Sequence, residues 1–198
     1  MPTRTGVKIT KIKAINTMAS YIGIPPISSL NEINQYPDLL LAQQVLDEMS
    51  QTVLASGLPC NVDYNYVLDE VDIDGIVIIP DGALICDIHN YKFRERDGRV
   101  YDVEAMSYHT GTGLQAYVIW DQEFDYLPEL VKRYITVSAS RSFVARVKGD
   151  QGLVSLTIPD EIRTKNQFQE YVNKMSDVSL LDDPDLAYIS FRKSRRFY

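Results

Sequence analysis

The sequence has few of the residues on which disulfide frameworks and metal sites depend. It contains two cysteines, Cys60 and Cys86, and two histidines, His89 and His109, among 198 residues. Two cysteines in apolar, strand-like surroundings cannot form a disulfide framework, and we expect buried free thiols rather than a bridge. The histidines stand 20 residues apart and lack close Cys or His partners, so a metal site would have to borrow carboxylates.

Long apolar runs are also missing. The longest run is far shorter than the roughly 20 residues that span a bilayer, which argues against a membrane helix. Lys8, Lys11 and Lys13 interrupt the first residues of the chain, so we expect no signal peptide. These absences predict a protein that is made in a cytoplasm and stays soluble.

Positive charge is scarce in the body of the chain and concentrated at its ends. The chain has 20 basic and 27 acidic residues, a net charge of −7, which argues against a dedicated DNA-clamping protein. Residues 1–13 carry +4 and residues 192–198 carry another +4, which leaves −15 on residues 14–191. The basic ends are either solvated termini or arms that dock on acidic partner surfaces.

The chain also lacks a convincing catalytic or ligand-binding motif. Residues 70–81 have the acid spacing of a calcium loop, but their β-rich surroundings and terminal aspartate favour a turn at 72–75 instead. Residues 110–113, Thr-Gly-Thr-Gly, lead into a strand rather than a helix, so we expect a strand connection and not a phosphate cradle. Cys86 and His89 would point to opposite faces of one strand, which argues against a nucleophilic pair.

The hydrophobic pattern predicts helices towards both ends of the chain and strands in the middle. Apolar residues recur with helical spacing in four segments, and the central residues alternate or form short apolar runs between turn residues. Asp97-Gly98 is a strong signal for a two-residue hairpin turn. The predicted helices cover about 8–22, 37–56, 128–146 and 160–175, and the predicted strands lie at 62–68, 75–88 (two strands around Pro80-Asp81-Gly82) and 114–121.

We therefore predict an α+β fold. It would be an antiparallel helical bundle with an inserted β-rich antiparallel unit and an extended C-terminal arm. Residues 1–57 together with 124–175 would form a discontinuous helical domain. Residues 58–123 would form the β-rich insertion and residues 176–198 the arm.

Three segments around the β-rich middle carry motifs that occur together in one known family. Residues 15–30, INTMASYIGIPPISSL, contain a helix followed by an Ile-Gly-x-Pro-Pro loop. Residues 42–57, AQQVLDEMSQTVLASG, form a helix that ends in glycine, and residues 125–149 form a Pro-led helix with Ala-Ser-Arg-x-Phe at 139–143. In order and spacing these segments resemble the tail tubular protein A family, the head-to-tail adaptors of short-tailed bacteriophages. The resemblance covers about residues 12–150.

This resemblance implies a structural protein of the virion tail, assembled in the host cytoplasm, with no cofactor and no enzymatic activity. About twelve copies would form a ring that joins the portal to the tail nozzle (tail tubular protein B) and the tail fibres. DNA would pass through the central channel without specific binding. The small residues Ser138, Ala139 and Ser142 would let a helix of a neighbouring subunit come close. The portal would be contacted by Arg192, Lys193, Arg195, Arg196, Phe197 and Tyr198.

Two other functions remain open at the level of sequence. One is a tail-associated hydrolase of cell wall or polysaccharide, whose carboxylates would have to face one cleft. The other is a nucleic-acid-binding module that uses the two basic ends, which would show a steep salt dependence of binding.

Overall fold

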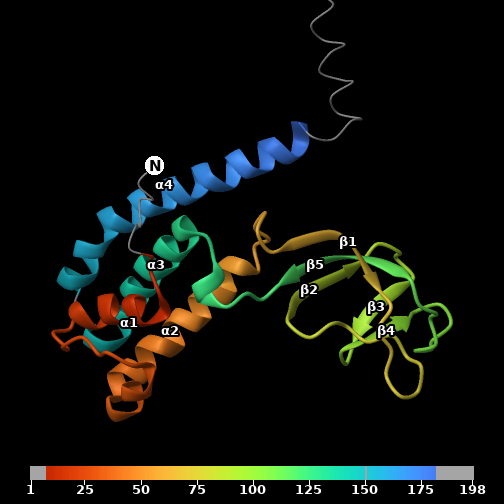
Figure 1. Cartoon of the computed structure of the whole chain (residues 1–198), viewed down its shortest axis with the longest axis horizontal. Helices are drawn as coiled ribbons and strands as arrows, with labels where there is room; N and C mark the ends of the chain where they lie inside the picture. The colour runs from red at the N-terminus through yellow and green to blue at the C-terminus, as the bar shows by residue number, and fades with distance from the viewer. Residues whose placement is uncertain (1–7, 150, 182–198) are drawn as a thin grey trace, which may run out of the picture.

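The computed structural model describes residues 8–149 and 151–181 (Figure 1). Helices α1, α2 and α3 lie towards one end of the long axis and two antiparallel sheets towards the other, and α4 runs from the helical end past the middle of the molecule (Figure 1). The predicted α+β class is confirmed. The N-terminal residues 1–7 and the part of the predicted arm from 182 to 198 lie outside the described residues.

The helices begin and end where the sequence supplies caps and breakers. The Thr10 hydroxyl caps the first helix by accepting from the Lys13 N–H. Gly23, with φ +80°, follows that helix, and Pro37 occupies the first turn of another. The helices are α1 (Lys11–Ser20), η1 (Leu30–Gln35), α2 (Pro37–Leu54), η2 (Phe124–Tyr126), α3 (Glu129–Lys148) and α4 (Gln151–Leu181).

Helix α4 differs most from the prediction. It begins at Gln151 and continues to Leu181, whereas the pattern predicted a helix from about 160 to 175 and a loop after it. Pro159 lies inside the helix, and proline removes one backbone donor and crowds the preceding turn, so a later start was expected. Packing against α3 outweighs this local cost: Thr157 and Thr164 on α4 are both buried.

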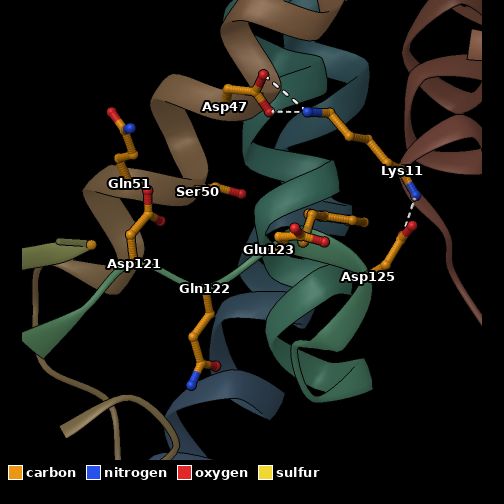
Figure 2. Close-up of a pocket in the computed structure, with 10 residues that line it drawn as sticks. Lys11, Asp47, Ser50, Gln51, Asp121, Gln122, Glu123 and Asp125 are labelled. Carbon is orange, nitrogen blue, oxygen red and sulfur yellow. Dashed lines mark hydrogen bonds and ion pairs between the residues drawn. The ribbon is translucent and has the colours of Figure 1, made fainter.

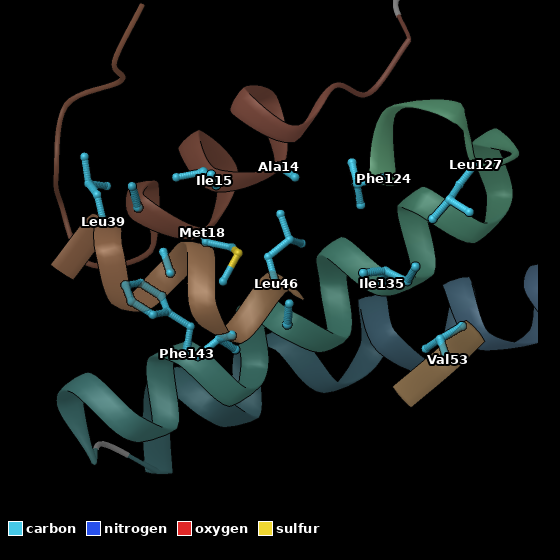
Figure 3. Close-up of a cluster of buried hydrophobic side chains, with 14 of the residues drawn as sticks. Ala14, Ile15, Met18, Leu39, Leu46, Val53, Phe124, Leu127, Ile135 and Phe143 are labelled. Atoms are coloured by element: carbon cyan, nitrogen blue, oxygen red, sulfur yellow. The ribbon is translucent and has the colours of Figure 1, made fainter. Parts of the chain in front are cut away.

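The helices share one cluster of buried apolar side chains (Figure 3). Phe143 of α3 lies in it together with Met18 of α1 and Leu46 of α2, and all three are fully buried. Side chains from the segment before α3, Phe124 and Leu127, belong to the same cluster. Burying such side chains contributes about 1.5–3 kcal/mol each, which makes this cluster the main source of stability in the helical part.

The sheets are antiparallel, as predicted. The larger sheet has the order β1-β5-β2, with Val62 opposite Ile119, and Ala116 and Val118 of its central strand are fully buried. The smaller sheet is a hairpin that turns at Asp97-Gly98, where both residues have positive φ, as the sequence predicted. The strands are β1 (Val62–Leu68), β2 (Ala83–Ile88), β3 (Phe93–Arg96), β4 (Arg99–Asp102) and β5 (Leu114–Trp120).

One predicted strand does not form. Residues 75–79 were expected to be a strand before the Pro80-Asp81-Gly82 turn, but they make isolated bridges instead, Val71 with Val77 and Ile78 with Arg99. Residues 75–79 lie over the small hairpin and do not add a strand to either sheet. Val77 is buried together with Val100 in a second cluster, which belongs to the sheets. The helices and the sheets thus have separate clusters of buried residues, and the domain boundaries given above remain a proposal.

Candidate functional site

Three carboxylates contact the chain where the basic N-terminal segment leads into α1. The Ile9 N–H donates to Glu129 Oε1 at 3.0 Å, and the Lys11 N–H donates to Asp125 Oδ1 at 2.7 Å. The Lys11 ammonium forms an ion pair with Asp47 at 2.8 Å. Because the first N–H groups of a helix lack partners within it, Asp125 caps α1 from another part of the chain. The start of α1 is therefore tied to both α2 and the segment before α3.

A pocket of about 620 Å³ lies beside this anchor, between α2 and the end of β5 (Figure 2). Asp121, Glu123 and Asp125 line it from the segment that joins β5 to α3. The Ser50 hydroxyl also lines the pocket, and it is buried without a hydrogen-bond partner in the described chain. Such a pocket favours a cationic group over an anion. No three His, Cys, Asp or Glu side chains of residues 8–149 and 151–181 lie close enough to hold a metal ion.

The small residues of α3 pack within the same chain. Ser138 is 4% exposed and Ala139 is fully buried, and Ser142 is half-buried. Helix α4 packs along α3 on either side of these residues in sequence: Tyr134 stacks on Phe168 with ring centroids 4.7 Å apart, and Arg141 pairs with Glu161 at 2.6 Å. As residue numbers rise on α3 they fall on α4, so the two helices are antiparallel.

Ala139 belongs to the buried cluster that α3 shares with α1 and α2, so helices of the same subunit already lie close to this part of α3. Contact of Ser138, Ala139 or Ser142 with a second copy stays a prediction. Of the three, Ser142 keeps the most exposure. The predicted portal-contact residues, from Arg192 to Tyr198, lie outside the described part of the chain.

The acidic turn at 72–75 forms as predicted. Asp72 Oδ1 accepts from the N–H groups of Asp74 at 2.9 Å and Ile76 at 3.0 Å, and Arg99 lies 3.0 Å from its other oxygen. The hydrogen bond from Ile76 is the main cause that holds the pKa of Asp72 below its usual value, helped by Asp74 and Arg99. This carboxylate serves the turn itself rather than a calcium ion.

The cysteines and His89 do not form a nucleophilic pair. Both cysteines are free thiols, as expected, but they are half-buried rather than buried. Burial, followed by the charges of Glu95 and Asp87, raises the pKa of Cys86 to about 11, which disfavours the reactive thiolate. The His89 ring nitrogen Nε2 lies 2.7 Å from the carbonyl oxygen of Tyr64 on β1.

Sequence reasoning missed a groove of about 420 Å³ between α1 and α3. We call it the basic groove; its lining includes Lys8, Ile9, Lys13, Arg133, Thr136 and Val137. Helical periodicity assigns residues to faces of single helices, but it does not show which two faces leave a space between them. The charged residues on the exposed sides of α1 and α3 were the available signal.

The comparison with protein families decides the identity. The family model described as tail tubular protein matches residues 12–178, which span α1, α2, both sheets, α3 and most of α4. The chain belongs to the tail tubular protein family. The resemblance read from residues 12–150 is confirmed, and the match extends it along α4.

This tail tubular protein is thus a structural protein of the phage tail, from a family of structural proteins rather than of enzymes. The family implies oligomerisation and assembly with other tail and portal components. A search of the curated proteins found no match to the chain. Among its described helices, none is both long enough and apolar enough to cross a bilayer.

Proposed function

We propose that this tail tubular protein is the head-to-tail adaptor of a short-tailed bacteriophage. About twelve copies would form a ring, assembled in the host cytoplasm, that joins the portal to the tail nozzle and the tail fibres. The observation that carries this proposal is the family match over residues 12–178, which includes all three segments that resemble the adaptors.

The charge distribution supports a channel through which DNA slides. Residues 58–123 contain thirteen acidic and four basic residues, so most of the negative charge of the body lies in the β-rich region. Acidic side chains along the lumen would repel DNA phosphates and prevent the DNA from sticking. The basic ends would point away from the DNA, towards acidic surfaces of the portal or of a neighbouring subunit.

Electron microscopy of the full chain mixed with its portal tests the proposal directly. We expect an annulus with a central hole, attached to the portal. Single globular particles that never form an annulus would contradict the adaptor function.

The proposed portal contact is tested by deleting residues 187–198. We expect portal binding to be lost while the truncated chain stays folded, because Val172 is the last residue of the helical cluster among those that the structure describes. A chain with Arg163 and Lys174 changed to Ala removes exposed positive charge from α4 instead and should bind normally. Unchanged portal binding after the deletion would refute the role of the tail.

A further inference from the structure

The basic groove has positive charge that forms no ion pair with the described residues of its own subunit. Its lining includes three cations, Lys8, Lys13 and Arg133, and none of them forms an ion pair within residues 8–149 and 151–181. The Lys13 ammonium donates to the backbone carbonyl of Lys8 at 3.1 Å, which fixes the Lys13 cation beside the segment that precedes α1. Beside the cations, the lining is aliphatic at Ile9 and Val137 and polar at Asn16, Thr17 and Thr136. The groove thus suits an aliphatic side chain flanked by carboxylates.

The β-rich region presents a segment with that chemistry. We call residues 69–74, Asp-Glu-Val-Asp-Ile-Asp, the acidic loop. Ile73 at its tip is fully exposed, with a relative accessibility of 101%, and Val71 is 44% exposed. Asp69, Glu70 and Asp74 form no ion pair with any described residue.

The acidic loop is held in one conformation. The Asp72 carboxylate accepts from two backbone N–H groups, and the Asp72 N–H donates to the Ile76 carbonyl at 2.9 Å. The Gly75 N–H donates back to the Asp72 carbonyl at 3.0 Å, and Arg99 pairs with the Asp72 side chain. These bonds fix the turn while Ile73 makes none of the contacts of the sheet cluster. A rigid turn loses little conformational freedom on binding, which favours its use as a docking element.

We propose that the acidic loop of one copy docks in the basic groove of the next copy. Ile73 enters between Ile9 and Val137, and Glu70 and Asp74 face the cations that rim the groove. Charge complementarity of this kind selects the partner and fixes the register of the contact. The inference rests on the ring of the proposed function and names the subunit contact that builds it.

The positions of the two surfaces fit a head-to-tail contact. Helices α1 and α3, which form the groove, lie at one end of the long axis, and the sheets that bear the loop lie at the other (Figure 1). A contact between two different surfaces of identical copies is heterologous, and such contacts close into rings when the rotation between copies is suitable. Because each copy has one acidic loop and one basic groove, every loop and every groove is occupied in a closed ring.

A charge exchange tests the contact with the full chain. Sedimentation would measure self-association over a range of concentrations for Arg133→Glu, for Asp74→Lys and for the wild type. We expect each variant alone to need at least a tenfold higher concentration for half-assembly. An equal mixture of the two variants should assemble like the wild type, since each altered loop then finds an altered groove and each native loop a native groove.

A second variant tests the apolar part of the contact. Ile73→Ser should also raise the concentration for half-assembly at least tenfold, without lowering the melting temperature of the free subunit. Met106→Ser is the matched control, because Met106 is a 78% exposed apolar residue of the same region outside the acidic loop. This control should assemble like the wild type.

The outcomes separate this contact from the adaptor function. If the variants assemble as readily as the wild type, or if their mixture fails to recover, the proposed contact is wrong. A wild-type chain that remains monomeric up to its solubility limit would overturn the contact as well. In each case an annulus on the portal by electron microscopy would leave the adaptor function standing, with another surface holding the copies together.

Discussion

Asn61 joins the end of the long helix α2 to the central strand of the sheet. Its side chain is 1% exposed; the amide oxygen accepts from the Leu58 N–H at 2.8 Å, and the amide nitrogen donates to the carbonyls of Leu54 and Trp120 at 3.1 and 2.7 Å. Nothing in the sequence pattern marked this residue, because its partners are backbone groups brought together by the fold.

We expect Asn61→Ala to lower the free energy of unfolding by roughly 2–4 kcal/mol, since it leaves buried backbone groups without partners. Urea denaturation measures the change. Asn65→Ala, at an exposed position of the neighbouring strand, is the control and should change stability by less than about 0.5 kcal/mol. Equal effects of the two changes would show that the buried bonds contribute little.

Cys86 gives a prediction on pH and reactivity. With a pKa of about 11, the Cys86 thiol carries only about 0.1% thiolate at pH 8, whereas an ordinary cysteine with a pKa near 8.5 carries about a quarter. Alkylation by iodoacetamide at pH 8 should therefore be at least about a hundredfold slower in the folded chain than in urea. The rate should rise about tenfold per pH unit up to the pKa. A rate in the folded chain equal to that in urea would contradict the raised pKa.

At the scale of elements, Gly57 sets how α2 meets the sheet. It follows the end of α2 with φ +73°, and a Cβ there would lie 2.8 Å from the Tyr117 hydroxyl and 3.2 Å from Ile119 Cδ1. Gly23 has a similar φ of +80° after α1, but a Cβ there would have no atom within 4 Å. The two glycines thus share the backbone requirement and differ in the space around them.

We expect Gly23→Ala to lower the free energy of unfolding by about 1 kcal/mol, which is the strain of the left-handed conformation alone. Gly57→Ala should cost at least about 1 kcal/mol more, because Tyr117 and Ile119 must also move. Thermal or urea unfolding of both variants measures the difference. Equal losses of stability in the two variants would show that the close approach of Gly57 to β5 does not affect the free energy of unfolding.

The elements themselves were predicted with uneven success, for identifiable reasons. The strand at 62–68 was predicted with its observed bounds, because aromatic and β-branched residues alternate along it between turn signals. Helix α4 was predicted to start too late, because Pro159 is a local stop signal that contacts with α3 override, and it also continues beyond the predicted end to Leu181. Local patterns therefore located elements whose ends depend on local chemistry and missed those whose ends depend on packing.

At the scale of the whole molecule, the two clusters of buried residues predict that the helical part folds without the sheets. Val62 and Ile119 are opposite each other in the sheet, so a short Gly-Ser linker can join them when residues 63–118 are deleted. We expect the shortened chain to keep its helical circular dichroism and to unfold cooperatively, since the helical cluster takes only Leu84 from the deleted residues.

The same shortened chain lacks the acidic loop, so it should not self-associate. Circular dichroism with thermal melting tests the fold, and sedimentation tests the association. A shortened chain without a cooperative transition would contradict the proposed division into a helical domain and an inserted β-rich unit.

The sequence by itself determined the class of the fold, the family and most element positions. These depend on residues that act locally: prolines and glycines at helix ends, Asp97-Gly98 at a hairpin, and motif segments at fixed spacing. Only the tertiary structure decided which elements pack against each other. It packed α4 along α3, joined α2 to β5 through Asn61, and left a basic groove at one end and an exposed Ile73 at the other. The physical reason is that burial and charge neutralisation depend on distances between residues far apart in the chain, which no local pattern encodes.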